Sequence, residues 1–354
     1  MAAIDLLFDH KGNSERLHQV VLSVLLLRSR LLERMLGVSG LRATDFKWEA
    51  EGKLFDLGFT VHDPSGAVEQ VFVELKIDSN LTEAQFARQQ EHTRQHKKAR
   101  LLYLVLGLTQ ISVTPTQLTK WSAAKPPVEP SPGPAFHHCD ASQLAALLAD
   151  PRSLLVAGDP THDRDVRDLL VGYRDALDRL VARTTGFADR PIADWQAPDF
   201  YGFFADCQKR PVGQMAKAGI SYEANPRGGF IACHWLRTPI HPSEPLRLYL
   251  QLENAKLCLK LKVPDEYKSK RKKLWDAAGA ALRTLAPKFS PPLEPSNYHS
   301  GVHMTFATIP EALTGERLDR EAFTAKIKAA EDLLREVAAK LLAKNTPPSP
   351  APGS

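Results

Sequence analysis

The pattern of apolar positions predicts alternating helices and strands in the first 150 residues. Leucine and valine recur at intervals of three and four between residues 14 and 37, which predicts a helix that begins at Ser14 and ends at Gly37. Further along, short runs of aliphatic, aromatic and β-branched residues are typical of strands. We expect strands near residues 43–50, 54–62, 68–78, 100–107 and 136–139, with helices at 82–97 and 141–148.

A second series of elements begins near residue 163. Residues 163–184 carry an apolar stripe at helical spacing, whereas several segments after residue 219 have the composition and alternation of strands. Residues 199–204 are rich in aromatic side chains and are interpreted as a packing cluster. We expect helices at 163–184, 265–286 and 319–344, and strands at 219–224, 229–237, 246–253, 256–263 and 302–308.

These elements together predict a mixed α/β protein of two domains. The first spans residues 1–155 and contains a proline-rich loop at 125–134. The second, an α+β domain at 160–345, is expected to bind substrate or to form a homodimer. Residues 346–354 are rich in proline, serine and glycine, which predicts a disordered tail.

Composition and charge agree with a soluble protein whose cysteines stay reduced. The 354 residues are 43% hydrophobic and 25% charged. The net charge of +5 is compatible with a nucleic-acid partner but is no evidence for one, because ordinary surface composition explains it better. No apolar run reaches the roughly 20 residues that span a bilayer. We expect no secretory signal, because the first residues lack a basic region followed by an apolar stretch, and the four cysteines form no CxxC pair. We therefore expect a cytoplasmic protein with no membrane partner and no zinc site.

Two acidic residues and a lysine are expected to meet on neighbouring strands. Asp56 lies in the strand predicted at 54–62, and Glu74 and Lys76 lie in the next, beyond a turn at residues 63–66. Alternate residues of a strand share a face, so Glu74 and Lys76 point the same way. Carboxylates on adjacent strands are the hard oxygen ligands that Mg²⁺ prefers, and the carbonyl of Leu75 adds another. The lysine can orient or deprotonate a water, or neutralise a phosphate.

These residues resemble the core of the PD-(D/E)xK nuclease superfamily. The likeness is closest to a bacterial branch that reads Asp-Ile, then Ile-Glu-Asn-Lys-Ile, then Gln-Leu. The corresponding segments here are Asp56-Leu57, Val73-Glu-Leu-Lys-Ile77 and Gln85-Phe86. Gln85 follows Lys76 by nine residues, as the motif of that branch implies, whereas Phe55 replaces the usual proline before the aspartate.

The same branch carries a glutamate on the first helix, which Glu15 resembles in the sequence Glu15-Arg-Leu-His18. The resemblance implies that Glu15 adds a catalytic carboxylate and metal ligand to Asp56, Glu74 and the carbonyl of Leu75. The other interpretation is that Glu15 only favours the helix dipole from the first turn. Glu33, near the end of the helix, competes for the same role and is interpreted as solvated.

The resemblance covers residues 12–150 and carries expectations about fold and activity. It implies a restriction-endonuclease-like αβββαβ core, with a central mixed sheet flanked by helices. It also implies an Mg²⁺-dependent endonuclease, with Mn²⁺ as a substitute, that hydrolyses DNA in restriction, repair or defence against phage. One alternative is a non-catalytic nucleic-acid-binding or regulatory module on the same scaffold. Another is a purely structural partner protein.

Further residues are candidates for contact with nucleic acid. Gln85, Gln89, His92 and His96 form one stripe of the helix at 82–97, so Gln89 and His92 can follow a phosphate backbone. Basic residues also cluster in the second domain, where they can engage phosphates. They are Lys260, Lys262, Lys270, Arg271, Lys272 and Lys273. The alternative for both groups is a solvated surface.

Overall fold

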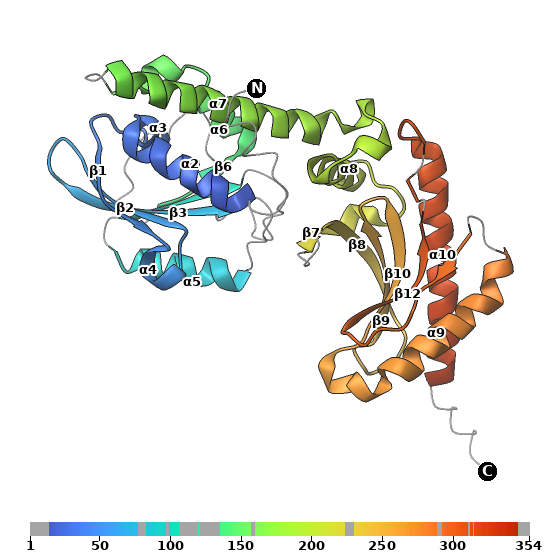
Figure 1. The fold of residues 1–354 in the computed structure, drawn as a ribbon. Helices are drawn as coiled ribbons and strands as arrows, with labels where there is room; N and C mark the ends of the chain where they lie inside the picture. The colour runs from blue at the N-terminus through green and yellow to red at the C-terminus, as the bar shows by residue number, and fades with distance from the viewer. Residues whose placement is uncertain are drawn as a thin grey trace, which may run out of the picture. The chain divides into compact units, whose positions relative to one another are not determined.

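A computed structural model describes most of the chain, and the structural statements below concern the described residues alone. They are residues 14–76, 83–96, 99–105, 119–120, 135–156, 160–223, 230–288, 292–310, 312–313 and 315–345. The proline-rich loop at 125–134 and the tail at 346–354 lie outside them. The chain divides into two compact units, the first ending at Arg183 and the second beginning at Thr184 (Figure 1).

The first unit is built on a mixed sheet of six strands in the order β1-β2-β3-β4-β6-β5. The first three pair antiparallel, and the rest of the sheet is parallel. The strands are β1 (Arg42–Trp48), β2 (Leu57–His62), β3 (Val68–Lys76), β4 (Ala99–Val105), β5 (Thr119–Lys120) and β6 (Ala135–Asp140). The expected strands and the β2–β3 hairpin are confirmed, because alternation and turn residues specify both locally.

Helices cover both faces of this sheet. They are α2 (Ser14–Arg28), α3 (Leu31–Leu36), α4 (Ala50–Lys53), α5 (Glu83–Arg94), α6 (Ala141–Leu147) and α7 (Pro160–Thr185). Figure 1 shows α2 and α3 on one side of the sheet and α4 and α5 on the other. The larger core lies between the sheet and α2, α3, α6 and α7, and a smaller core that contains three phenylalanines lies on the side of α4 and α5. The mixed α/β class is therefore confirmed. The restriction-endonuclease-like assignment stays a prediction.

The single helix expected at 14–37 is wrong, because the structure breaks it at Ser29 and Arg30. The Ser29 hydroxyl donates to the carbonyl of Leu25 at 2.6 Å and accepts from the amide of Leu31 at 3.1 Å. The Ser29 hydroxyl thus gives the Leu31 amide an acceptor at the break, while the Leu25 carbonyl also keeps its backbone bond from the Ser29 amide. Gly37 ends α3 as expected, in a left-handed conformation with φ of 67°.

Helix α7 belongs to the first unit, although its sequence suggested the start of the second. Val166, Leu170, Tyr173 and Leu177 are buried in the larger core. The expected domain boundary at 155–160 therefore lies ahead of the division that the structure shows. The apolar stripe of α7 predicted a helix but not which sheet it would cover.

The second unit is an antiparallel sheet of six strands in the order β11-β12-β10-β9-β8-β7. The strands are β7 (Gly219–Glu223), β8 (Phe230–Pro239), β9 (Arg247–Glu253), β10 (Lys256–Lys262), β11 (Glu294–Pro295) and β12 (His303–Ile309). Helices α8 (Ala197–Lys209), α9 (Arg271–Leu285) and α10 (Arg320–Asn345) pack against its apolar face. The opposite face carries the polar residues of each strand.

Residues 199–204 form part of α8, and the expected packing cluster is confirmed. Phe203 and Phe204 are fully buried. Gly202 lies so close to the end of α7 that a Cβ atom there would be 1.9 Å from the carbonyl oxygen of Thr184. Only glycine fits at this position.

The state of the cysteines and the hydropathy of the helices can be read directly from the structure. All four cysteines are buried and free: Cys139 in the first unit, and Cys207, Cys233 and Cys258 in the second. Among the described residues, no helix is long and apolar enough to cross a bilayer.

Candidate functional site

The β2–β3 hairpin brings Asp56 to the level of Glu74. Leu57 pairs with Val73, and Asp56 comes directly before Leu57. The Asp56 Oδ2 atom accepts a hydrogen bond of 2.7 Å from the backbone amide of Leu75, which fixes the carboxylate against β3. Because β3 is buried along its second half, both Glu74 and Lys76 are removed from water, at 2% and 6% exposure.

Glu74 is surrounded by three donors. Its Oε1 atom accepts from Gln85 Nε2 at 2.7 Å and forms an ion pair with the Lys76 ammonium. Its Oε2 atom accepts from Gln89 Nε2 at 2.7 Å, and the same amide donates to the carbonyl of Leu54 at 2.8 Å. Helix α5 therefore places two glutamines, one turn apart, on a single carboxylate.

Burial and bonding act on the charge of Glu74 in opposite directions. Burial raises the pKa of the Glu74 carboxyl and is the dominant effect. The charge of Lys76 and the hydrogen bonds from Lys76, Gln89 and Gln85 lower the pKa again without cancelling the rise. The carboxylate is consequently poised, in that loss of any donor moves it toward the protonated form.

Gln19 is a site residue that the sequence reasoning missed. Its side-chain amide donates to Asp56 Oδ1 at 2.9 Å, so the first helix reaches the aspartate through an amide. The side-chain carbonyl of Gln19 in turn accepts from Arg16 at 3.1 Å. The available signal was two polar residues, His18 and Gln19, at positions that face the core.

His18 and Glu15 have different outcomes. The His18 ring is buried, and its Nδ1 atom lies 2.9 Å from the hydroxyl of Tyr173 on α7. It therefore ties two helices together instead of facing the carboxylates. The side chain of Glu15 lies outside the described residues, so its proposed roles stay predictions.

The donor set fits a hard divalent cation. Mg²⁺ commonly takes one or two protein carboxylates and completes its shell with waters and substrate phosphates. Asp56 and Glu74 supply two carboxylates, and each of their four oxygens accepts a described hydrogen bond that holds it in place. Among the described residues, no three side chains of His, Cys, Asp or Glu converge as a metal site. A carbonyl, water or substrate oxygen, or the Glu15 carboxylate that lies outside the described residues, would complete the shell.

The stripe on α5 is divided between two environments. Gln85 and Gln89 contact Glu74, as described above. His92 and His96 lie together, with their Nε2 atoms 3.3 Å apart and both rings against Phe72. His92 also faces Glu51 at 3.7 Å. These imidazoles thus belong to the smaller phenylalanine core, and the expected role of His92 in nucleic-acid binding stays a prediction.

The basic residues of the second unit do not form one exposed patch. Lys260 is 9% exposed and pairs with Glu253 at 2.7 Å. Arg271 is buried and bonds the carbonyl of Val263 and the carboxylate of Asp265. Lys260 and Arg271 are therefore largely removed from solvent, and their expected contact with nucleic acid stays a prediction.

The other basic residues are more accessible. Lys270 pairs with Glu244, and Lys272 pairs with Asp276 at 2.5 Å. Lys273 is exposed, and Lys262 is partly exposed at the end of β10. Their expected contact with nucleic acid stays a prediction.

Comparisons of the chain with protein-family models, with curated proteins and with solved structures gave no match.

Proposed function

We propose that the chain is a metal-dependent nuclease that hydrolyses phosphodiester bonds of DNA at a site formed by Asp56, Glu74 and Lys76. The observation that carries the proposal is the burial of a carboxylate and an ammonium side by side next to a second carboxylate. Buried charges cost free energy that an apolar pair would avoid, so a fold retains them more readily where chemistry requires them. Restriction, repair and defence against phage in the cytoplasm are the settings we propose.

The side chains have distinct roles in this proposal. Asp56 and Glu74 would hold Mg²⁺, with the Leu75 carbonyl as a further candidate ligand. When bound, the ion polarises a phosphoryl oxygen and lowers the pKa of a water ligand. The Lys76 ammonium orients the attacking water or neutralises charge on the phosphate. Water oxygen bonds to phosphorus and releases a proton to solvent, the ester P–O bond breaks, and the leaving alkoxide takes up a proton from solvent.

The amides around the carboxylates position these residues. Gln85 and Gln89 fix both oxygens of Glu74, while Gln19 and the Leu75 amide fix both oxygens of Asp56. Such contacts restrict carboxylate rotation and keep ligands in a productive geometry. Each of these contacts would act by positioning a carboxylate.

The test is cleavage of plasmid, linear and single-stranded DNA by the purified chain with Mg²⁺ or Mn²⁺. We expect Asp56→Asn and Lys76→Ala to reduce the cleavage rate by at least about a hundredfold, the effect typical of lost charge stabilisation. Glu91→Gln, on the exposed side of α5, is the matched control and should cleave normally. No cleavage by the wild type, or equal cleavage by Lys76→Ala, would contradict the proposal.

A non-catalytic nucleic-acid-binding module is the second candidate. The observation that favours it is that the carboxylates of Asp56 and Glu74 are already hydrogen-bonded by protein groups. Such a module would bind DNA in EDTA with a strong salt dependence and would cleave no substrate. Calorimetric titration with Mn²⁺ separates the two candidates. The nuclease must bind the ion, and Asp56→Asn should abolish that binding, whereas the non-catalytic module requires no ion.

A further inference from the structure

Strand β8 of the second unit contains a bulge at a left-handed residue. Trp235 pairs with Leu250 and Thr238 with Leu248, so Leu236 and Arg237 together lie opposite Tyr249. Leu236 has φ of 54°, which lies in the left-handed region that residues with a Cβ atom rarely adopt. Bulges of this kind bend a strand and re-aim a side chain, and strained backbone is concentrated at binding and catalytic sites.

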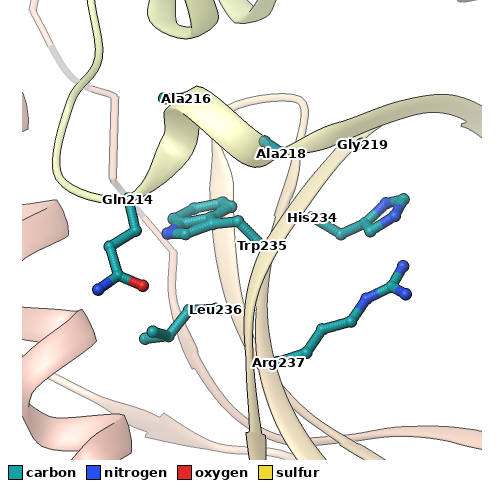
Figure 2. A pocket seen from close by; sticks show the side chains of 8 residues that line it. All are labelled: Gln214, Ala216, Ala218, Gly219, His234, Trp235, Leu236 and Arg237. Atoms are coloured by element: carbon teal, nitrogen blue, oxygen red, sulfur yellow. The ribbon is translucent and has the colours of Figure 1, made fainter.

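The bulge changes the direction of Arg237. Regular alternation would place Arg237 on the same side of the strand as Trp235, two residues earlier. Figure 2 shows instead that His234 and Arg237 extend side by side from one side of β8, whereas Trp235 and Leu236 lie on the other. The bulge at Leu236 therefore places the guanidinium of Arg237 on the polar face of the sheet.

A cavity of about 700 Å³ lies at this point of the sheet. Its size is that of a small-molecule site, for which 300–1,000 Å³ is typical. The strand β7 begins at Gly219 opposite His234, so β8 continues past the end of its neighbour beside the cavity. The lining residues are Gln214, Ala216, Ala218, Gly219, His234, Trp235, Leu236 and Arg237 (Figure 2).

Gly219 makes room for the imidazole of His234. A Cβ atom on residue 219 would lie 2.5 Å from His234 Nε2 and 2.6 Å from its Cε1. The ring thus rests directly on the backbone of β7, at the start of the strand. Any side chain at residue 219 would push the imidazole away from this position.

The groups in the cavity are complementary to an anion. In the described part of the chain, neither His234 nor Arg237 has a hydrogen-bond or ion-pair partner. The carboxylates nearby are already engaged: Glu223 accepts from Ser221 at 2.7 Å, and Glu253 accepts from Lys260 at 2.7 Å. An unpaired guanidinium beside an imidazole donor suits the oxygens of a phosphate.

Two further observations refine the choice of ligand. Burial, and next the charge of Arg237, lower the pKa of His234, which favours a neutral ring that can donate one hydrogen bond. Ala216, Ala218 and Leu236 give the cavity an apolar wall. A phosphate carried by an organic group matches both parts.

We propose that this cavity binds a phosphate monoester of nucleotide size, with the phosphate on Arg237 and His234 and the organic group along the rest of the lining. The ligand is either a free mononucleotide or the phosphorylated 5′ end of a DNA strand. The site is separate from Asp56, Glu74 and Lys76, and its existence does not depend on the proposed nuclease activity.

The experiment is calorimetric titration of the full chain in EDTA with deoxyadenosine monophosphate, deoxyadenosine and inorganic phosphate. We expect the monophosphate to bind at least tenfold more tightly than the nucleoside, because a charged hydrogen bond contributes about 1.5–3 kcal/mol. Arg237→Gln should remove that difference. Arg247→Gln is the matched control, since Arg247 is exposed on the same sheet but does not line the cavity.

A second variant tests the site without removing a polar group. Gly219→Ala should weaken monophosphate binding severalfold by displacing His234, and it decides the question should Arg237→Gln fail to fold by circular dichroism. Equal binding of nucleotide and nucleoside, no binding of either, or wild-type affinity in folded variants would overturn the proposal. Asp56→Asn should bind the monophosphate normally, so failure of the nuclease proposal is distinguished from failure of this one.

Oligonucleotides then identify the source of the phosphate. An oligonucleotide with a 5′-phosphate that binds at least tenfold more tightly than the mononucleotide assigns the cavity to strand ends. Equal or weaker binding of that oligonucleotide, with the mononucleotide still bound, assigns it to free nucleotides. The matching 5′-hydroxyl oligonucleotide controls for contacts elsewhere on the chain.

Discussion

Glu74 and Lys76 are coupled through their opposite charges. Both side chains are buried, and the charge of each compensates the charge of the other. A buried ion pair adds little net stability, but removal of one partner leaves an uncompensated charge. The residue-scale properties of the site should therefore appear as coupled effects on stability and pH dependence.

Lys76→Ala tests this coupling directly. We expect a loss of about 3 kcal/mol in the free energy of unfolding at pH 8, the effect typical of a broken buried pair. Without the lysine, burial raises the pKa of Glu74 further, so protonation at lower pH relieves the cost. The loss should therefore be smaller at pH 5, as measured by urea unfolding. Lys47→Ala, on the exposed edge strand, is the control, and an equal loss for Lys76→Ala at both pH values would refute the coupling.

Gln89→Ala tests the amide contacts of the same carboxylate. Gln89 is fully buried and donates to both Glu74 and Leu54. Removing it leaves two buried acceptors without this donor, which we expect to cost about 2–3 kcal/mol in unfolding free energy. Gln90→Ala, one residue along α5, is the control and should cost less, because the only bond described for its side chain is a 3.4 Å contact with Arg94. Equal losses in the two variants would show that the amide of Gln89 has no special role.

The sequence predicted most of this site because the contacts are local. Glu74 and Lys76 follow from alternation on one strand, and Gln85 from the first turn of the next helix. Gln19 was missed because its contact with Asp56 joins residues 37 apart, and no periodicity specifies which part of a helix meets a hairpin. The direction of the pKa shift at Glu74 could not be predicted from the sequence either, because it depends on how deeply the carboxyl group is buried.

At the scale of elements, two glycines in helices are expected to respond in opposite ways. Gly202→Ala places a Cβ atom against the carbonyl of Thr184, so we expect a destabilisation of at least about 2 kcal/mol. Gly279→Ala in α9 meets only the mobile end of Arg283 at 3.6 Å, so the gain in helix propensity should stabilise by about 0.5–1 kcal/mol. Thermal unfolding of both variants checks the signs. Stabilisation by both would show that α8 can move away from Thr184.

The elements themselves were predicted unevenly. Strands of the second unit were found within a few residues, because alternation and the Asn254 turn between β9 and β10 mark them clearly. The break at Ser29 was not found, since the apolar spacing continues through it and only side-chain hydrogen bonds reveal it. The burial of Lys260 was also unexpected, because alternation assigns a face and does not say whether water reaches it.

At the scale of the whole molecule, His18 makes stability depend on pH. Burial lowers the pKa of His18 to about 3 from 6.5, so the folded state favours the neutral ring. The unfolded chain binds the proton first as the pH falls below 6.5, and stability is lost in that range. The linkage relation gives a loss of about 2 kcal/mol between neutral pH and pH 5 from this residue.

Two variants distinguish the titration of His18 from the loss of its hydrogen bond to Tyr173. His18→Gln should flatten the dependence of unfolding free energy on pH between 7 and 5. Tyr173→Phe should lower stability by about 1 kcal/mol by losing a hydrogen bond, yet keep the wild-type slope because the ring stays buried. Chemical unfolding at several pH values provides the measurement. Parallel curves for wild type and His18→Gln would contradict the assignment.

The placement of the cysteines turns them into reporters of partial unfolding. Burial raises the pKa of every thiol, to about 12 for Cys207 and Cys258, so the folded chain offers few thiolates to an alkylating reagent. Cys139 lies in the first unit, and the other three lie in the second. Timed labelling with iodoacetamide and intact mass measurement would therefore give one adduct when the first unit opens and three when the second does. The number of adducts therefore tells which unit opens first, without any added label or substitution.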